Sequence, residues 1–420
     1  MSTVDNRICS ANTSHNVVLK QTFTVSFNYT VHFTEHVFDP GNDLFVKLLQ
    51  SAGKNFRHRV LVVIDNGVAS AVPTLTNDII VYSHRCNTHI ELACEPVVVA
   101  GGESLKSNSE ELARLQQIVA DLRLDRHSFI VGIGGGALLD TVGFVAATAH
   151  RGIRHIRVPT TVLAQNDSGV GVKNGVNQFG QKNYLGTFAP PFAVVNDYAF
   201  IKALPAREKV SGISEAVKVA LIRDAVFFHW LESNANRLTE FNPQSLQYMI
   251  KRCAELHMTQ IAKGGDPFET GSVRPLDFGH WAAHRLESLS AYTLRHGEAV
   301  AIGIALDTRY SVLAGLLAAG VDERIYRLLQ HLGFALWHPA MATVNDKNHA
   351  DILQGLSDFR EHIGGELNIT LIKEIGVAVE VQQIDQNLML KAIEWLSNYR
   401  GGTFGDSRAI HNVGINKMAT

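Results

Sequence analysis

Three histidines that lie close together between residues 263 and 301 are the side chains best suited to chemistry in this chain. His280 and His284 are four residues apart in a segment that predicts a helix, so both rings would share one face of it. His296 begins a second predicted helix, which is apolar over most of its length. Two imidazoles from separate helix starts, joined by one carboxylate from elsewhere, would form a catalytic zinc site with a position open for substrate. Histidines that bind no metal, satisfied on a helix surface or in the core, are the alternative.

The composition is that of a globular protein long enough for two domains. The chain has 420 residues, of which 46% are hydrophobic and 19% charged, and a formal net charge of −2. We therefore expect no nucleic acid partner and no anionic membrane surface. A negatively charged small substrate would need a local cluster of cations in its site.

Three features favour a cytoplasmic protein. The first twenty residues lack the apolar core of a signal peptide. No stretch approaches the roughly 18 apolar residues of a membrane span. The four cysteines show no CxxC spacing and no regular framework, so we interpret them as ordinary small residues in a reducing compartment.

The first part of the chain alternates predicted strands with turns and helices. Residues 21–34 alternate polar with apolar or aromatic side chains, which predicts a strand with one buried face. A later apolar stretch closes on Asp65, and another is followed by Glu103 and Lys106. An apolar strand that closes on polar residues is typical of the binding edge of an open α/β sheet, and a plain turn is the alternative.

Three consecutive glycines, Gly134, Gly135 and Gly136, connect a predicted buried strand to a helix. Glycines let the backbone approach a phosphate, and the free N–H groups at the start of the helix can bind it. The pattern is GGG-x3-D, ending at Asp140, and so differs from the GxGxxG of a standard dinucleotide site. We favour a phosphate site here over a tight strand-to-helix turn.

Residues 153–197 are more polar than a structural connection requires. The polar side chains that glycine and proline space apart in this stretch are Thr160, Thr161, Asn166, Asp167, Lys173, Lys182 and Asn183. Long irregular segments with such side chains are usually functional. The lysines are candidates to bind an anionic ligand, and solvated loop charges are the alternative.

Beyond about residue 200 the pattern changes to helices, with one late hairpin-like stretch that carries Lys373. Glu215 and Lys218 lie three residues apart on one face of an otherwise apolar predicted helix. A buried carboxylate needs a partner, which either a metal or Lys218 would supply. We expect a flexible extension over residues 1–20, an α/β domain over 21–200, and a mainly helical domain over 201–420.

Several motifs, in this order and spacing, resemble the sugar-phosphate cyclases of the 3-dehydroquinate synthase family. They are GGGALLDTVGFVAATAHRG, VPTTVLAQNDSGVGVKNGVN, GQKNYLG, GISEAVK, and LDFGHWAAHRLE followed by LRHGEAVAIGIA. The resemblance spans nearly the whole chain from about residue 20. It implies an α/β fold with an N-terminal Rossmann-like NAD-binding domain, followed by a mainly α-helical metal-binding domain, and it implies a homodimer.

The resemblance also assigns roles to individual residues. It implies a Zn2+ or Co2+ ion bound by Glu215, His280 and His296, so that His284 becomes a substrate-side group. The implied NAD-binding residues are Asp65, Glu103, Lys106, Gly134, Gly135, Gly136, Asp140, Thr160, Thr161 and Lys182. The implied catalytic groups are Lys173, Arg151, His284 and Asp167, and the implied substrate-binding residues are Asn183, Lys218, Arg274, Asp277 and Lys373.

Departures from the family pattern bear on the substrate. Arg274 stands one residue nearer His280 than in the usual dehydroquinate synthase motif, and Asp277 replaces an amide. A lysine expected before the GGDPFE stretch is absent, and His257 stands near its place. The loss of one cation and the gain of one carboxylate predict a neutral-headed sugar phosphate instead of the phosphorylated heptulosonate.

Two narrower resemblances point the same way. The RPLDFGHW run is similar to 2-epi-5-epi-valiolone synthases, which cyclise sedoheptulose 7-phosphate. The whole chain resembles the dehydroquinate-synthase-like members of Ebo gene clusters, whose substrate the resemblance does not supply.

The family reaction implies no net redox change. NAD takes a hydride from a secondary hydroxyl, phosphate leaves, the hydride returns, and an intramolecular aldol step closes the ring. The alternatives are a 3-dehydroquinate synthase proper, a metal-dependent polyol or glycerol-phosphate dehydrogenase that would release NADH, and a catalytically silent relative that binds NAD or a sugar phosphate.

Overall fold

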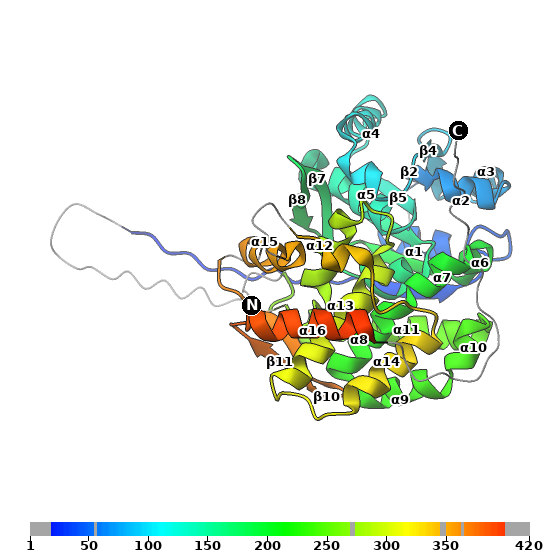
Figure 1. The fold of residues 1–420 in the computed structure, drawn as a ribbon. Helices are drawn as coiled ribbons and strands as arrows, with labels where there is room; N and C mark the ends of the chain where they lie inside the picture. The colour runs from blue at the N-terminus through cyan, green and yellow to red at the C-terminus, as the bar shows by residue number, and fades with distance from the viewer. Residues whose placement is uncertain (1–17, 54–56, 269–273, 345–349, 363–364, 400–420) are drawn as a thin grey trace, which may run out of the picture.

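The computed structural model describes residues 18–53, 57–268, 274–344, 350–362 and 365–399. Seven parallel strands form the sheet of the first half, in the order β1-β9-β6-β5-β2-β3, with β4 also paired to β2 (Figure 1). The strands are β1 (Thr30–Thr34), β2 (His58–Asp65), β3 (Ile90–Leu92), β4 (Val97–Val99), β5 (Phe129–Gly134), β6 (Arg154–Pro159) and β9 (Ala193–Asp197). The carboxyl ends of β2, β5 and β6 therefore meet at one edge of the sheet, where an open α/β fold binds its ligands.

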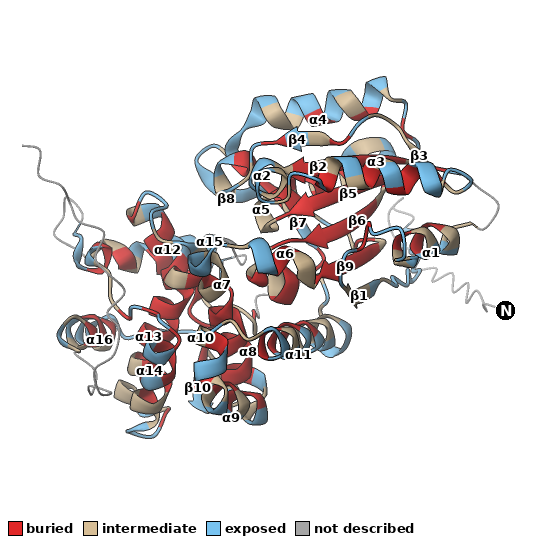
Figure 2. Ribbon diagram, turned by 90° about the vertical axis from the view of Figure 1, so that its right-hand side faces the viewer, coloured by how far each residue is buried: buried red, intermediate tan, exposed pale blue. Residues whose placement is uncertain are grey.

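Both faces of this sheet are covered by helices. Alternate residues of β2 enter different cores: Val60, Val62 and Ile64 pack with one cluster, and Leu61 and Val63 with the other. The first cluster includes residues of α1 (Leu44–Ser51) and α3 (Leu75–Arg85), and the second those of α4 (Ser109–Asp121) and α5 (Gly136–Thr148). The strands are buried on both sides in Figure 2, as parallel sheets require. This confirms the predicted α/β fold.

The predicted N-terminal strand is much shorter than expected. Only Thr30–Thr34 form β1, which pairs with β9 from Thr30 opposite Ala193. The alternating residues upstream have no strand beside them, so residues 18–29 adopt no regular structure (Figure 1). The end of this segment still contacts the body, since Phe27 meets Phe268 and the Tyr29 hydroxyl donates to the Val170 carbonyl at 2.9 Å. Phe23 is 82% exposed there. Of the predicted flexible extension over residues 1–20, residues 1–17 lie outside the described residues.

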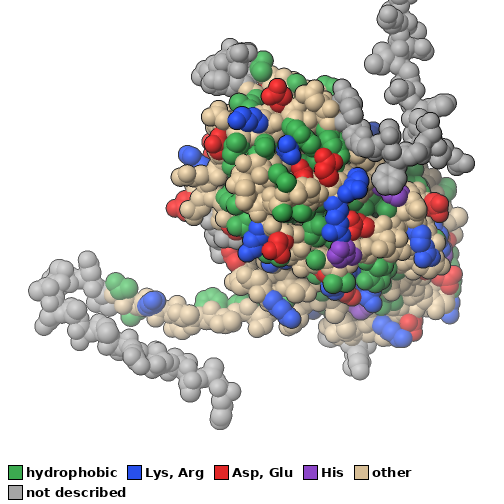
Figure 3. Space-filling view, turned by 60° about the horizontal axis from the view of Figure 1, so that its bottom comes forward, with side chains coloured by type: hydrophobic (Ala, Val, Ile, Leu, Met, Phe, Trp, Pro, Cys, Tyr) green, Lys and Arg blue, Asp and Glu red, His purple; other side chains and the backbone are tan. Residues whose placement is uncertain are grey.

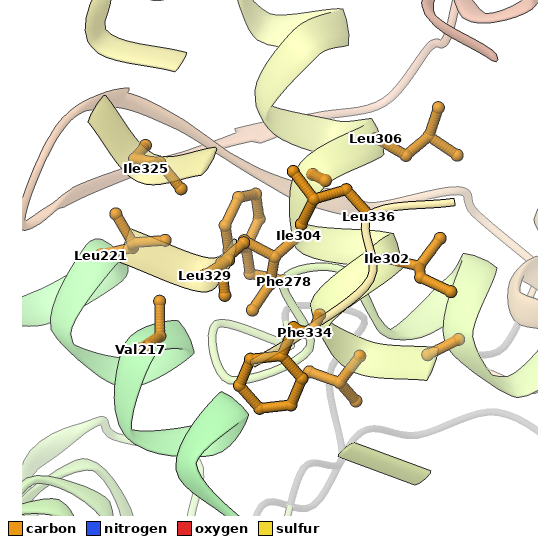
Figure 4. Close-up of a cluster of buried hydrophobic side chains, with 14 of the residues drawn as sticks. Val217, Leu221, Phe278, Ile302, Ile304, Leu306, Ile325, Leu329, Phe334 and Leu336 are labelled. Atoms are coloured by element: carbon orange, nitrogen blue, oxygen red, sulfur yellow. The ribbon is translucent and has the colours of Figure 1, made fainter. Parts of the chain in front are cut away.

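Helices dominate the second half of the chain. They are α6 (Tyr198–Ala203), α7 (Ala206–Ser211), α8 (Ile213–Arg223), α9 (Ala225–Ser233), α10 (Ala235–Thr239), α11 (Pro243–Lys263), α12 (His280–Leu289), α13 (His296–Leu313), α14 (Val321–His331), α15 (Gln354–His362) and α16 (Gln386–Asn398). Helices α8 and α13 lie in the middle of this half, and their apolar side chains meet those of α14 in the core shown in Figure 4. No described helix is both long and apolar enough to cross a membrane.

Two hairpins complete the fold. Strands β7 (Lys173–Gln178) and β8 (Gln181–Phe188) form an antiparallel pair whose outer strand β8 is largely exposed. Strands β10 (Ile369–Glu374) and β11 (Val377–Val381) form the C-terminal hairpin that the sequence predicted around Lys373. Charged side chains of both signs are interspersed over the face seen in Figure 3, which fits the small net charge.

Helices α12 and α13 touch at a pair of glycines. Gly279 precedes α12 with φ at +78°, a left-handed conformation that favours glycine. A Cβ on Gly303 of α13 would lie 2.0 Å from the Gly279 carbonyl oxygen. The backbones therefore pack without side chains between them, which sets the distance between the two helices that begin at His280 and His296.

Candidate active site

Glu215, His280 and His296 meet in the helical half, although they come from three different helices. Glu215 lies in the first turn of α8, and the two histidines are the first residues of α12 and α13. One ligand atom from each lies within 4.8 Å of the others. The Nε2 atoms of both histidines are 3.6 Å from the same Glu215 oxygen, Oε1. This is a His2Glu arrangement of the kind that binds zinc in catalytic sites.

Both rings are held so that Nε2 faces Glu215. Nδ1 of His280 is 3.2 Å from the Phe278 carbonyl oxygen, and Nδ1 of His296 is 3.2 Å from Glu287 Oε2. Because carbonyl and carboxylate oxygens accept hydrogen bonds, each Nδ1 carries a hydrogen, and Nε2 is the nitrogen that would bind a metal after losing any proton of its own. Such outer contacts are typical of histidines that bind metals.

The electrostatics also fit a divalent cation. The Glu215 side chain is fully buried, and its Oε1 has no hydrogen-bond donor among the described residues, while Lys218 forms an ion pair with Oε2. Burial alone would raise the pKa of Glu215, but Lys218 outweighs it and lowers the pKa to about 2. Burial would lower the pKa of His296, whereas Glu287 and Glu215 raise it to about 9. The carboxylates of Glu215 and Glu287 thus favour positive charge between them. Nitrogen and oxygen ligands of this kind suit zinc or cobalt.

His284 lies outside this triad. It is exposed one turn along α12, with its ring centroid 5.5 Å from that of His280. With Glu287 and His296 it forms a second group whose possible ligand atoms lie within 4.8 Å of one another. Both groups need His296, so one ion would occupy one or the other.

The glycine turn lies at the carboxyl edge of the sheet. Gly134 ends β5, and α5 starts at Gly136 with N–H groups at its first turn. Asp65 ends β2 beside Gly101, where a Cβ would lie 1.9 Å from Asp65 Oδ2. Thr160 follows β6 and donates its backbone N–H to the Gly134 carbonyl at 3.0 Å. The predicted cofactor residues at the ends of three neighbouring strands therefore lie together at one edge of the sheet.

Lys106 links this edge of the sheet to the β7–β8 hairpin. Its Nζ is 2.7 Å from Asp140 Oδ2 and also donates to the side chain of Asn183 in β8. The preceding residue, Lys182, has its Nζ 3.8 Å from Glu103 Oε1. The hairpin is thus held against predicted cofactor residues by polar contacts.

Asp167 connects the polar loop to the helical half. His257 Nδ1 is 2.9 Å from Asp167 Oδ1, and Lys218 Nζ is 3.7 Å from the same oxygen. Burial would raise the pKa of Asp167, but Lys218 and His257 together bring it well below its usual range. The Asp167 carboxylate therefore stays ionised. His257, which stands near the place of the lysine expected from the family pattern, is its direct partner.

Neighbouring contacts join these groups into one series. It runs from Asp140 through Lys106 to Asn183, from Lys182 through Glu287 to His296, and from Glu215 through Lys218 and Asp167 to His257. The predicted cofactor residues at the sheet edge and the His2Glu triad are thus joined by one continuous series of polar contacts.

Some predicted residues lie apart from this series. Arg151 is exposed beyond the far end of α5, about 20 Å from the glycine turn by the rise of a 13-residue helix. Lys373 is exposed in β10, and no described ion pair joins it to the group. Arg274 is buried in the turn before α12, where Thr370 donates its hydroxyl to the Arg274 carbonyl, and Asp277 closes that turn. Lys173 is exposed at the start of β7.

Two residues with structural roles in the site received none from the sequence. Glu287 contacts both His296 and Lys182, and its position seven residues after His280 on the same helix face was the available signal. Asp307 of α13 is fully buried and accepts hydrogen bonds from Gly279 N at 3.0 Å and Trp281 Nε1 at 2.8 Å. These two donors flank His280.

Asp307 makes a pH-dependent contribution to stability. Burial raises its pKa from 3.8 to about 7, although the Trp281 and Gly279 hydrogen bonds oppose the shift. The folded state therefore binds more protons than the unfolded state between about pH 4 and 7, so this contribution falls as the pH rises through that window. In Asp307→Asn we expect urea midpoints to depend less on pH between 4 and 7. An unchanged slope would contradict this assignment.

Comparison with known proteins places the chain. The family model described as 3-dehydroquinate synthase N-terminal matches residues 96–211, and the model described as 3-dehydroquinate synthase C-terminal matches residues 212–354. The chain belongs to the 3-dehydroquinate synthase family. It is therefore one of the carbon–oxygen lyases that act on phosphates, as the sequence motifs predicted.

Individual relatives of this family cover most of the chain. A 3-dehydroquinate synthase from Desulforamulus reducens is 35% identical over 322 residues, 76% of this chain and 85% of the relative. A 2-epi-5-epi-valiolone synthase from Streptomyces glaucescens is 33% identical over 366 residues, 85% of this chain and 87% of the relative. The solved 2-epi-5-epi-valiolone synthase from Streptomyces hygroscopicus subsp. jinggangensis, with NAD+ and Zn2+ bound, superimposes with a TM-score of 0.79 at 27% identity, covering 90% of this chain and 99% of that one.

Proposed function

We propose that this chain is an NAD- and metal-dependent sugar-phosphate cyclase. Its substrate is a neutral-headed ketose phosphate, that is, one without a carboxylate. The observation that carries the proposal is the continuous polar series from the glycine turn at Gly134 to the His2Glu triad. This series supports a site for a hydride acceptor next to a site for a divalent cation. The relatives with bound NAD+ and Zn2+ support both cofactors here.

The overall reaction conserves electrons. A secondary hydroxyl of the substrate is oxidised, inorganic phosphate leaves from a neighbouring carbon, the hydride returns, and an intramolecular aldol step closes the carbocycle. NAD, when bound, supplies a reversible hydride acceptor, and the metal supplies a Lewis acid. Glu215, His280 and His296 would hold the metal.

The chain's own groups would bind the substrate and move its proton. Lys173 and Lys182, on the hairpin, would hold the departing phosphate through charge-assisted hydrogen bonds. His284 is exposed beside His280 and would accept the proton next to the new carbonyl. Arg151 of the same chain has no part in this proposal because it lies at the opposite end of α5.

The surroundings of Asp167 support the choice of substrate. His257 is occupied by its hydrogen bond to Asp167, and Lys218 lies between Asp167 and Glu215. Asp277 adds a further carboxylate within the field of Lys218. Carboxylates of the chain already pair with His257 and Lys218. The site therefore has little free positive charge for a substrate carboxylate. Sedoheptulose 7-phosphate, which has none, suits it better than the phosphorylated heptulosonate.

An assay of released phosphate tests the proposal. Purified protein with NAD and Zn2+ should release phosphate from sedoheptulose 7-phosphate without net NADH formation. The phosphorylated heptulosonate is the matched substrate, and equal or faster release from it would favour a 3-dehydroquinate synthase. Formation of NADH in stoichiometric amounts would favour a polyol dehydrogenase. If a protein that holds metal and NAD releases no phosphate from either sugar, a non-catalytic relative is favoured. The homodimer and the cytoplasmic location stay predictions.

A further inference from the structure

Glu287 is the buried residue that touches both halves of the site. It lies in α12 with 4% of its surface exposed. Its Oε2 is 3.2 Å from His296 Nδ1, and both of its oxygens are 3.1 Å from Lys182 Nζ. One carboxylate therefore contacts a candidate metal ligand and a lysine of the β7–β8 hairpin at the same time.

The two strands of the hairpin are held in different ways. The inner strand β7 packs against α5 with Val176 buried, whereas the outer strand β8 is largely exposed, so polar contacts hold β8 in place. On the sheet side it is held by Asn183 to Lys106 and by Asn177 to Ser107, the latter at 3.1 Å. On the helical side Lys182 provides an ion pair to Glu287. Buried Arg157 separately holds the Lys173 carbonyl at the start of β7 at 2.9 Å, so the contacts of β8 bear on the position of Lys182.

We infer that Glu287 is a positioning residue that couples metal binding to the placement of the β7–β8 hairpin. It orients His296 with Nε2 toward Glu215, and it holds Lys182 with the same carboxylate. A metal on the triad fixes the His296 ring, which fixes Glu287 and then Lys182. By reciprocity, a hairpin that is held in place raises the affinity for the metal. This inference rests on the proposed metal site.

Two measurements test the coupling without using catalysis. The first is Zn2+ affinity by competition with a chromophoric chelator, and the second is hydrogen exchange of the hairpin amides with and without Zn2+. In Glu287→Gln we expect Zn2+ affinity to fall about 10–100-fold, the usual effect of removing an outer contact to a metal-bound histidine. In the wild type we expect Zn2+ to slow exchange in residues 173–188, and in this variant we expect that effect to disappear.

Lys182→Met separates the coupling from a folding defect, because Lys182 is partly exposed. It should fold normally and lose the Zn2+-dependent protection of the hairpin. The matched controls are Glu232→Gln and Lys202→Met, which remove surface ion pairs with Arg324 and Glu35 and should behave like the wild type.

The outcomes separate this inference from the proposed function. No Zn2+ binding by the wild type would overturn the proposed metal site and the coupling together. Zn2+ binding that is equal in the wild type and in Glu287→Gln, or Zn2+-dependent hairpin protection that survives in Lys182→Met, would overturn the coupling alone.

Discussion

His280→Ala is expected to reduce Zn2+ affinity by at least ~100-fold while the protein stays folded. The ring supplies one of three protein ligands, and even the loss of an outer contact to such a ligand costs about 10–100-fold. His280 lies at the start of α12, so its removal leaves the apolar core of the helix in place. Metal content after dialysis, with circular dichroism as the check on folding, measures both effects.

His284→Ala provides the matched control for this experiment. The two histidines are one turn apart on α12, but only His280 faces Glu215. We expect His284→Ala to keep its metal. Metal loss in His284→Ala together with retention in His280→Ala would mean that the ion binds at the group formed by His284, Glu287 and His296 instead.

Gly303→Ala should lower the free energy of unfolding by about 3 kcal/mol, the upper range for overpacking a core. The new Cβ would lie 2.0 Å from the Gly279 carbonyl oxygen and 3.1 Å from Gly279 Cα. Both are backbone atoms, so α12 and α13 must separate to relieve the clash. The urea midpoint of unfolding measures the loss, and Zn2+ affinity should fall with it because the two histidine helices move apart.

Gly135→Ala controls for the gain of a methyl group at a glycine. Its Cβ would meet Thr161 Cγ2 at 3.5 Å, an ordinary contact, and its φ of −75° suits any residue. We expect its urea midpoint to change little, within about 1 kcal/mol. A Gly303→Ala protein as stable as the wild type would show that the crossing of α12 and α13 tolerates side chains.

The fold class could be predicted because the central strands β2 and β5 are apolar stretches that end at Asp65 and Gly134. The length of β1 could not be predicted, since the alternation over residues 21–34 says nothing about where β9 lies alongside. β1 begins at Thr30 because its parallel partner β9 begins opposite it, at Ala193. The alternation of residue types shows which face of a segment is apolar. Whether another element packs against that face depends on the rest of the fold.

The candidate site, like the fold, could be predicted only in part. The sequence places His280, His284 and Glu287 on one helix face, but spacing alone cannot show which of them points at Glu215 of another helix. Arg151 was grouped with the other cations by motif, yet the length of α5 already separates it from the glycine turn. The roles assigned to individual residues stay predictions until the experiments above are done.

The close crossing of α12 and α13 has an evolutionary consequence. Substitutions at Gly279 or Gly303 would disturb packing and should be selected against, whereas substitutions at exposed positions of β8 should cost little stability. A duplicated gene could therefore acquire a new sugar phosphate by drift in the hairpin and around Asp277, with the metal-binding helices inherited intact. Substrate preference in such a lineage would diverge faster than reaction chemistry.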